Sequence, residues 1–126
     1  MRALKIVLVL NFIFLRVYGI GENLETSKVV SLKCEYIVNP LGIDTSHPRL
    51  TWQMVDTKHG AMQTAYQIKV GKDEESILKG IGDYWDSGKI ESQDILVKYA
   101  GLKLKPWTKY FWTVTIWDNK GNKMVA

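Results

Sequence analysis

Cysteine and histidine are scarce in this 126-residue chain, which holds a single cysteine, Cys34, and two histidines, His47 and His59. One cysteine cannot form a disulfide within the chain. Because Cys34 lies in an alternating apolar run, we interpret it as a buried free thiol, with an intermolecular bridge as the alternative. The sequence offers no Cys/His cluster for a metal ion, so we predict no metal site and no cofactor.

Net charge is nearly absent from most of the chain. The formal charge is +4, but three basic residues (Arg2, Lys5 and Arg16) lie before Ile20 in a segment without an acidic residue. The remaining residues carry 14 basic against 13 acidic side chains. Nucleic-acid binding needs Lys and Arg concentrated on one face of the folded part, so we predict no nucleic-acid partner.

A long apolar run is absent as well. The run Ile6–Leu15 is shorter than the roughly 20 apolar residues of a transmembrane helix. Basic residues precede it, and Val17 and Gly19 supply the spacing of a cleavage site, an order typical of a secretory signal peptide. We therefore predict a leader at residues 1–19 and a mature domain at residues 20–126. The protein should be secreted, to the periplasm or the bacterial cell surface, with no membrane contact after cleavage; a buried N-terminal element is the alternative.

Helical spacing is limited to residues 73–79, which allow one or two turns. Elsewhere apolar residues alternate with period two in short segments separated by Gly, Pro, Asn and Asp, which predicts β-strands. The alternating residues are Val30, Leu32, Cys34 and Tyr36; Leu50, Trp52 and Met54; Tyr66, Ile68 and Val70; Ile95, Val97 and Tyr99; and Tyr110, Trp112, Val114 and Ile116.

Short strands without a long helix predict an all-β fold, an immunoglobulin-like or fibronectin type III β-sandwich. Tyr110 begins the longest strand, where its ring can turn inward and hydrogen-bond the backbone of the preceding corner, a tyrosine corner of Greek-key sandwiches. Pro106 fixes the backbone of that corner. Trp52 supplies a large central core residue. We therefore assign structural roles to Trp52, Pro106 and Tyr110.

The final strand of such a sandwich should begin near Lys123, after a hairpin loop at residues 118–121, but the sequence ends at Ala126. In this fold the last strand pairs with the long strand at residues 110–117, which otherwise keeps an open edge. We therefore expect a module truncated at its C-terminus, with an incomplete final strand that its natural continuation completes.

Carboxylates and aromatic rings are the remaining candidates for a site. Asp83 and Asp86 flank Trp85, but residues three positions apart on an extended segment point to opposite faces. We interpret both as turn residues and predict no catalytic residue. Aromatic residues on loops or on the outward parity are candidate contacts to a sugar or to an adjoining domain; these are Tyr84, Trp85, Trp107 and Trp117.

An ordered series of motifs lies between Leu32 and Gly121. It comprises CEY at 34–36, NPLGID at 39–44, PRLTWQ at 48–53, QTAYQI at 63–68, WDSGK at 85–89, YAG at 99–101, YFW at 110–112 and WDNKG at 117–121. In order and spacing this series resembles the opening of secreted bacterial α-L-rhamnosidases, which are glycoside hydrolases.

The resemblance implies a non-catalytic fibronectin-like module ahead of further β-domains and a helical (α/α)-barrel catalytic domain. That family removes terminal α-L-rhamnose from plant glycans by inversion, and its acidic catalytic residues belong to the barrel. The module is then expected to pack against and orient the downstream domains of the parent enzyme. The alternatives are a free-standing carbohydrate-binding module that contacts plant glycan through its exposed aromatics, and a surface-interaction domain with protein partners.

Overall fold

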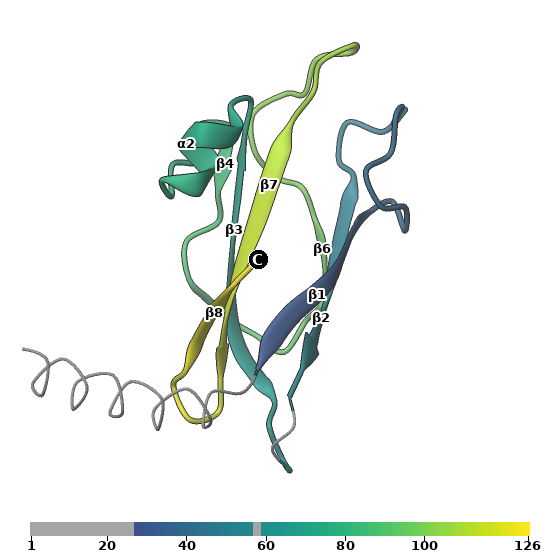
Figure 1. The fold of residues 1–126 in the computed structure, drawn as a ribbon. Coiled ribbons are helices and arrows are strands. Elements are labelled where there is room, and N and C mark those ends of the chain that lie inside the picture. The colour runs from purple at the N-terminus through teal and green to yellow at the C-terminus, as the bar shows by residue number, and fades with distance from the viewer. Residues whose placement is uncertain (1–26, 57–58) are drawn as a thin grey trace, which may run out of the picture.

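The protein is a two-layer antiparallel β-sandwich, seen in a computed structural model that describes residues 27–56 and 59–126 (Figure 1). The predicted leader lies outside these residues. The elements are β1 (Lys28–Cys34), β2 (Arg49–Val55), β3 (Gln63–Gly71), α2 (Glu74–Leu78), β4 (Trp85–Asp86), β5 (Ile90–Glu91), β6 (Leu96–Lys98), β7 (Phe111–Asp118) and β8 (Lys123–Val125). The all-β sandwich predicted from the alternation is confirmed.

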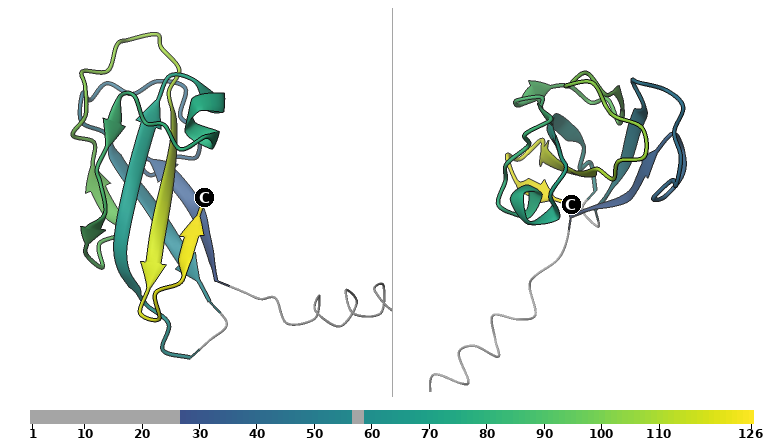
Figure 2. Two further views of the ribbon diagram at one scale, coloured as in Figure 1. Left: turned by 90° about the vertical axis from the view of Figure 1, so that its left-hand side faces the viewer. Right: turned by 90° about the horizontal axis from the view of Figure 1, so that it is seen from above.

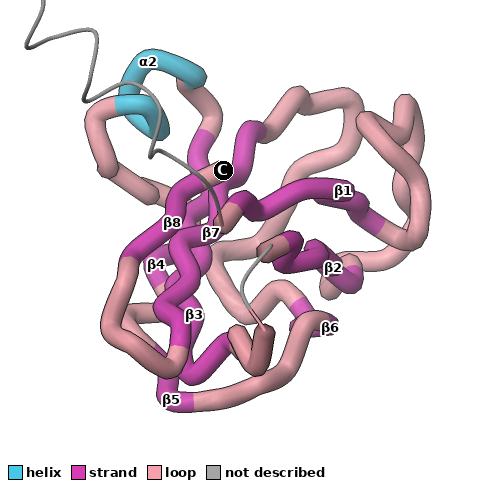
Figure 3. The backbone as a smooth tube through the Cα atoms, turned by 60° about the horizontal axis from the view of Figure 1, so that its bottom comes forward, coloured by secondary structure: helices cyan, strands magenta, loops and turns pink. Residues whose placement is uncertain are grey.

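One sheet has the strand order β1-β2-β6, and the other has β4-β3-β7-β8, with β5 also paired to β3. Figure 3 shows the two sets of strands as separate layers. The β3–β7 ladder is the longest pairing, running from Gln63 opposite Asp118 to Gly71 opposite Phe111. These two central strands therefore set the length of the sandwich.

The core lies between the sheets, and its largest member is Trp52, which is 1% exposed. The Trp52 and Tyr66 rings meet across the two sheets at a centroid distance of 5.4 Å. The predicted inward positions of β2, β3 and β7 are buried or packed against this core. Buried core residues are Leu50, Trp52, Tyr66, Ile68, Val70, Tyr99, Val114, Ile116 and Met124.

The first and fourth strands differ from the prediction. Tyr36 is exposed because β1 ends at Cys34, and the N–H and C=O of Cys34 both bond Ile37, at 3.0 Å, around a two-residue turn. Cys34 is a free thiol that is half-buried rather than fully buried. In the strand predicted over residues 95–99, Ile95 lies outside β6 and is exposed, whereas Tyr99 is buried.

A β-bulge shifts the start of β3, because Gln63 pairs with Asp118 and Ala65 pairs with Trp117. Thr64 is the extra residue, and its hydroxyl donates to the carbonyl oxygens of Trp117 and Asp118 at 3.3 and 3.1 Å. The bulge turns Gln63 into the interior, where it is 6% exposed.

The predicted helical segment forms α2, a helix of five residues. Asp73 caps it by accepting hydrogen bonds from the N–H and hydroxyl of Ser76, which lower the pKa of the Asp73 carboxyl. Ile77 is its buried residue and lies against Gly71 at the end of β3. Among residues 27–56 and 59–126, no helix is long and apolar enough to cross a membrane.

The final strand begins at Lys123, as predicted, and pairs with β7 at residues 115–117. Val114 and Ala126 extend the pairing by exchanging two backbone hydrogen bonds. Because β8 is antiparallel to β7, it runs toward the end of the sandwich where β7 begins. The β1–β2 segment (residues 35–48), the β6–β7 segment (residues 99–110) and α2 lie at this same end, which we call the loop end (Figures 1 and 2).

Candidate functional site

Two of the four candidate aromatic residues, Tyr84 and Trp85, are half-buried and pack against the core. The Tyr84 ring lies 5.0 Å from the Tyr110 ring, and Trp85 meets Tyr99 edge-on at 5.3 Å. We call these two ring pairs the ring cluster; the Tyr99 hydroxyl of one pair lies 3.5 Å from the Tyr84 carbonyl oxygen of the other. Most of the apolar surface of Tyr84 and Trp85 is therefore already engaged within the domain.

The β6–β7 segment is anchored by two tyrosine hydroxyls. Tyr110 accepts the backbone N–H of Lys105 at 2.8 Å, which is the contact expected of a tyrosine corner. Tyr99 donates to the carbonyl oxygen of Leu102 at 2.5 Å. Burial, followed by the neighbouring Tyr110 and Tyr84, raises the pKa of Tyr99 to about 12, so this donor stays protonated at neutral pH.

Gly101 allows the same segment to lie close to the ring cluster. A Cβ at this position would lie 2.5 Å from both the Trp85 Cβ and the Tyr84 carbonyl oxygen. The N–H of Leu102, the next residue, donates to that Tyr84 carbonyl oxygen at 2.9 Å. A side chain at Gly101 would therefore push the segment away from β4.

Trp107 is the candidate whose ring is free. Its side chain is fully exposed, and its φ of 56° lies in the left-handed region. A bulky residue held there costs about 1–3 kcal/mol, and such strain is concentrated at functional positions. Thr108 stabilises the turn by donating from its hydroxyl to the Pro106 carbonyl oxygen at 3.1 Å. The loop end thus presents a full indole to its surroundings.

Trp117 lies on the outer face of the second sheet and is half-buried. The Nζ atoms of Lys89 and Lys123 lie 4.7 and 6.0 Å from the centre of its ring. Lys89 also pairs with Glu91 at 3.6 Å, and Ala65, the partner of Trp117 on β3, is completely buried. Cation–π contacts thus occupy the ring, and a sugar that stacked on it would have to displace a lysine.

The β1–β2 segment displays apolar side chains that the sequence reasoning did not select. Its exposed residues are Tyr36, Ile37, Val38, Leu41 and Ile43. The signal available in the sequence was the Asn39-Pro40-Leu41-Gly42 turn, which places an apolar residue where a polar one is usual.

Arg49 holds the turn that begins this segment. Its backbone N–H donates to one Glu35 carboxylate oxygen at 2.6 Å, and its Nη2 donates to the other at 2.7 Å. The guanidinium carbon lies 4.7 Å from the Tyr36 ring centre. Both turn residues have positive φ, 51° and 66°, which normally favours Asn-Gly. The hydrogen bonds from Arg49 lower the pKa of Glu35, so the clamp stays charged at neutral pH.

Asp86 and Asp118 both accept hydrogen bonds from backbone N–H groups in the turns that follow them. Asp86 accepts from the Gln67 amide at 2.8 Å and from the Gly88 N–H at 2.9 Å, and the Gln67 bond is the main cause of its lowered pKa. Asp118 is 3% exposed and accepts from the N–H groups of Lys120 and Asn122 in the β7–β8 hairpin. In the part of the chain that the structure describes, no three His, Cys, Asp or Glu side chains gather to hold a metal ion.

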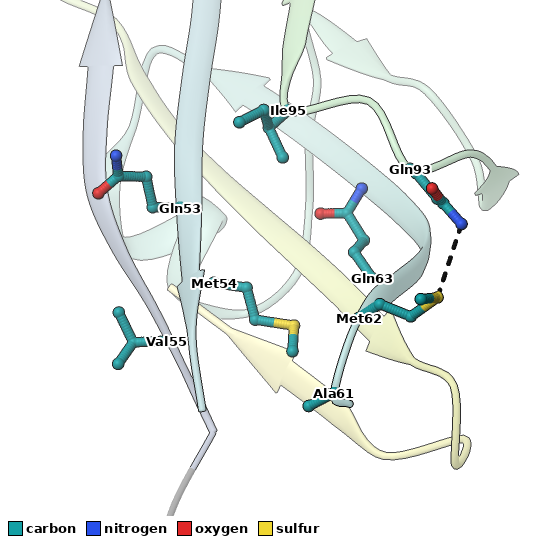
Figure 4. A pocket seen from close by; sticks show the side chains of 8 residues that line it. All are labelled: Gln53, Met54, Val55, Ala61, Met62, Gln63, Gln93 and Ile95. Carbon is teal, nitrogen blue, oxygen red and sulfur yellow. Dashed lines mark hydrogen bonds between the residues drawn. The ribbon is translucent and has the colours of Figure 1, made fainter. Parts of the chain in front are cut away.

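A hollow of about 410 Å³ lies at the end of the sandwich opposite the loop end (Figure 4). Two methionines, three glutamines and three smaller apolar residues line it, and Gln93 donates to the Met62 sulfur at 3.7 Å. Among the described residues that line it, none has an ionisable side chain. These residues offer apolar contacts and neutral hydrogen bonds.

Comparison with known proteins gives one family. The family model described as "Rha78A-like, N-terminal immunoglobulin domain" matches residues 29–126. An α-L-rhamnosidase of Streptomyces avermitilis is 46% identical over 95 residues, which cover 75% of this chain and 9% of that protein. One of Alteromonas sp. is 38% identical over 113 residues, covering 87% of this chain and 12% of that protein.

Two solved structures have the same fold. The α-L-rhamnosidase from Dictyoglumus thermophilum superposes with a TM-score of 0.76 at 39% identity, over 79% of this chain and 11% of that one. The Streptomyces avermitilis α-L-rhamnosidase complexed with L-rhamnose superposes with a TM-score of 0.73 at 44% identity, over 79% of this chain and 10% of that one. The chain thus spans about a tenth of the length of the relatives it matches. From residue 29 to residue 126, it belongs to the family of Rha78A-like N-terminal immunoglobulin domains of α-L-rhamnosidases.

Proposed function

We propose that this chain is a non-catalytic N-terminal module of an α-L-rhamnosidase, which packs against and orients neighbouring domains of the enzyme. The observation that carries this proposal is the family match to the N-terminal tenth of α-L-rhamnosidases. The polar groups of the described residues support it, because the buried ones complete the sandwich itself. Gln63 bonds Trp52, and Asp118 bonds its own hairpin.

In this proposal the parent enzyme acts on rhamnose-containing plant glycans and this module contributes stability and geometry rather than chemistry. The protein is also inferred to be exported to the periplasm or the cell surface. The basic and apolar leader pattern before Ile20 supports export. N-terminal sequencing of the exported protein should begin at Ile20, and a mature protein that begins at Met1 would contradict it.

The purified chain tests the non-catalytic role. It should release no product from an aryl α-L-rhamnoside and should give no saturable heat on titration with L-rhamnose. Product release would refute the proposal. Saturable binding of rhamnose or pectin that is lost in Trp107→Ala would favour a carbohydrate-binding module instead, because Trp107 offers the fully exposed ring.

A further inference from the structure

We infer that the loop end of the sandwich is the surface on which the following domain of the parent rhamnosidase docks. This inference rests on the proposed function and adds the location and chemistry of the contact. Its first support is the direction of the chain: β8 runs antiparallel to β7 and so toward the loop end. Most of the length of the relatives lies outside the matched N-terminal tenth.

The second support is the apolar character of both loops at this end. Leu41 in the β1–β2 segment and Trp107 in the β6–β7 segment are fully exposed. Leu102, also in the β6–β7 segment, is exposed as well. Exposed apolar groups gathered from separate segments mark interaction surfaces, and tryptophan in particular is a frequent anchor. The side chains on this surface are Ile37, Val38, Leu41, Ile43, Leu102 and Trp107.

The third support is that both loops are anchored at their bases. Arg49 clamps the turn at Glu35, and the Tyr110 hydroxyl fixes Lys105. The two loops leave the sheet side by side, since the N–H of Tyr99 donates to the Pro48 carbonyl oxygen at 2.8 Å and so continues the β2–β6 ladder. Loops anchored in this way have less conformational freedom to lose on docking than loops without such bonds.

Charge specifies the partner further. The β6–β7 segment carries Lys103, Lys105 and Lys109, with no acidic residue between Asp94 and Asp118. Because Asp44 lies on the β1–β2 segment and Glu74 and Glu75 lie on α2 at the same end, only the side of the partner that faces the β6–β7 segment is expected to be acidic. The occupant is the following domain of the same polypeptide, with an apolar patch that is acidic on the side facing the β6–β7 segment.

Hydrogen exchange tests the inference on a chimera in which residues 29–126 replace the matched domain of the Streptomyces avermitilis enzyme. Amides of residues 35–48 and 100–109 should exchange at least about tenfold more slowly in the chimera than in the isolated chain. Amides of residues 60–63 and 91–95, beside the hollow, should exchange equally in both. Protection confined to the hollow, or no protection at the loop end, would overturn the inference.

Single substitutions give a second readout. Leu41→Ser and Trp107→Ser should leave the melting temperature of the isolated chain unchanged and should remove the protection in the chimera. Met62→Ser, an exposed residue of the opposite end, is the matched control and should retain it. Equal protection in all three variants would refute the docking surface. An active chimera without that protection would refute this inference alone, whereas hydrolysis by the isolated chain would refute the proposed function.

Discussion

Gln63→Leu tests how the two sheets are joined in the interior. The Trp52 indole N–H donates to the Gln63 side-chain oxygen at 2.8 Å, and Trp52 is 1% exposed. The Gln63 amide nitrogen donates to the carbonyl oxygens of Ser92 and Asp94 at 3.1 and 2.8 Å. Leucine has a similar volume but can make none of these three bonds.

The expected cost follows from which groups water can reach. Asp94 is exposed and Ser92 is half-buried in the connection between β5 and β6, so water can reach their carbonyl oxygens after the change. The Trp52 N–H cannot, and an unpaired buried donor costs about 1–3 kcal/mol. We therefore expect a loss of about 2 kcal/mol in the free energy of unfolding. For a domain of about 100 residues this lowers the melting temperature by roughly 8–16 °C.

Thermal and urea unfolding followed by tryptophan fluorescence measure this loss. Gln67→Leu is the matched control, because Gln67 lies on the same strand and bonds the exposed Asp86. It should change the free energy of unfolding by less than about 0.5 kcal/mol. In a Trp52→Phe background, Gln63→Leu should cost much less, since the donor is gone. An unchanged melting temperature for Gln63→Leu, or the same loss in both backgrounds, would refute the reasoning.

Three further predictions concern the loop end and the free thiol. Tyr110→Phe removes the hydrogen bond to the backbone of the corner and should lower the free energy of unfolding by about 0.5–1.5 kcal/mol. Tyr36→Phe, at an exposed tyrosine, is the control and should lower it less. Equal losses would contradict the role of Tyr110 in the tyrosine corner. Gly101→Ala should lower the melting temperature by overpacking, whereas Gly42→Ala, where a Cβ meets nothing within 4 Å, should not; equal melting would refute the close approach. Burial, then the nearby Glu35, raises the pKa of Cys34 to about 11 from 9.0, so its alkylation by iodoacetamide at pH 8 should be roughly 100-fold slower in the folded than in the unfolded chain. Equal alkylation rates in the two states would contradict the raised pKa. Because the folded pKa is the higher one, Cys34 contributes stability that is present below pH 9.0 and is lost as the pH rises toward about 11.

Strand positions could be predicted wherever alternation continued without interruption. Tyr66, Ile68 and Val70 face the core because successive side chains of a strand point to opposite faces. Gln63 could not be placed this way, since the bulge at Thr64 reverses the parity before it. Its inward position depends on Trp52, a partner on another strand, which no local pattern reveals.

The inward position predicted for Tyr36 is wrong for a related reason. Its alternation with Cys34 predicts an inward ring, but the chain turns at Glu35 with positive φ at both turn residues. The turn is held by Arg49, 14 positions away in the sequence. The exposed apolar loop that follows was therefore hidden within the expected strand and turn. Sequence pattern thus predicted the sandwich, whereas the contacts between its segments determine which residues the loop end displays.

The most direct test of the central claim compares two forms of the Streptomyces avermitilis enzyme: one without its matched domain, and one in which residues 29–126 of this chain replace it. The quantity measured is the rate of aryl α-L-rhamnoside hydrolysis after incubation at increasing temperature. We predict that the chimera keeps its rate to a higher temperature than the shortened enzyme, while the isolated chain gives no hydrolysis. Equal thermal inactivation of the two enzyme forms, or hydrolysis by the isolated chain, would contradict a module that supports the enzyme without taking part in catalysis.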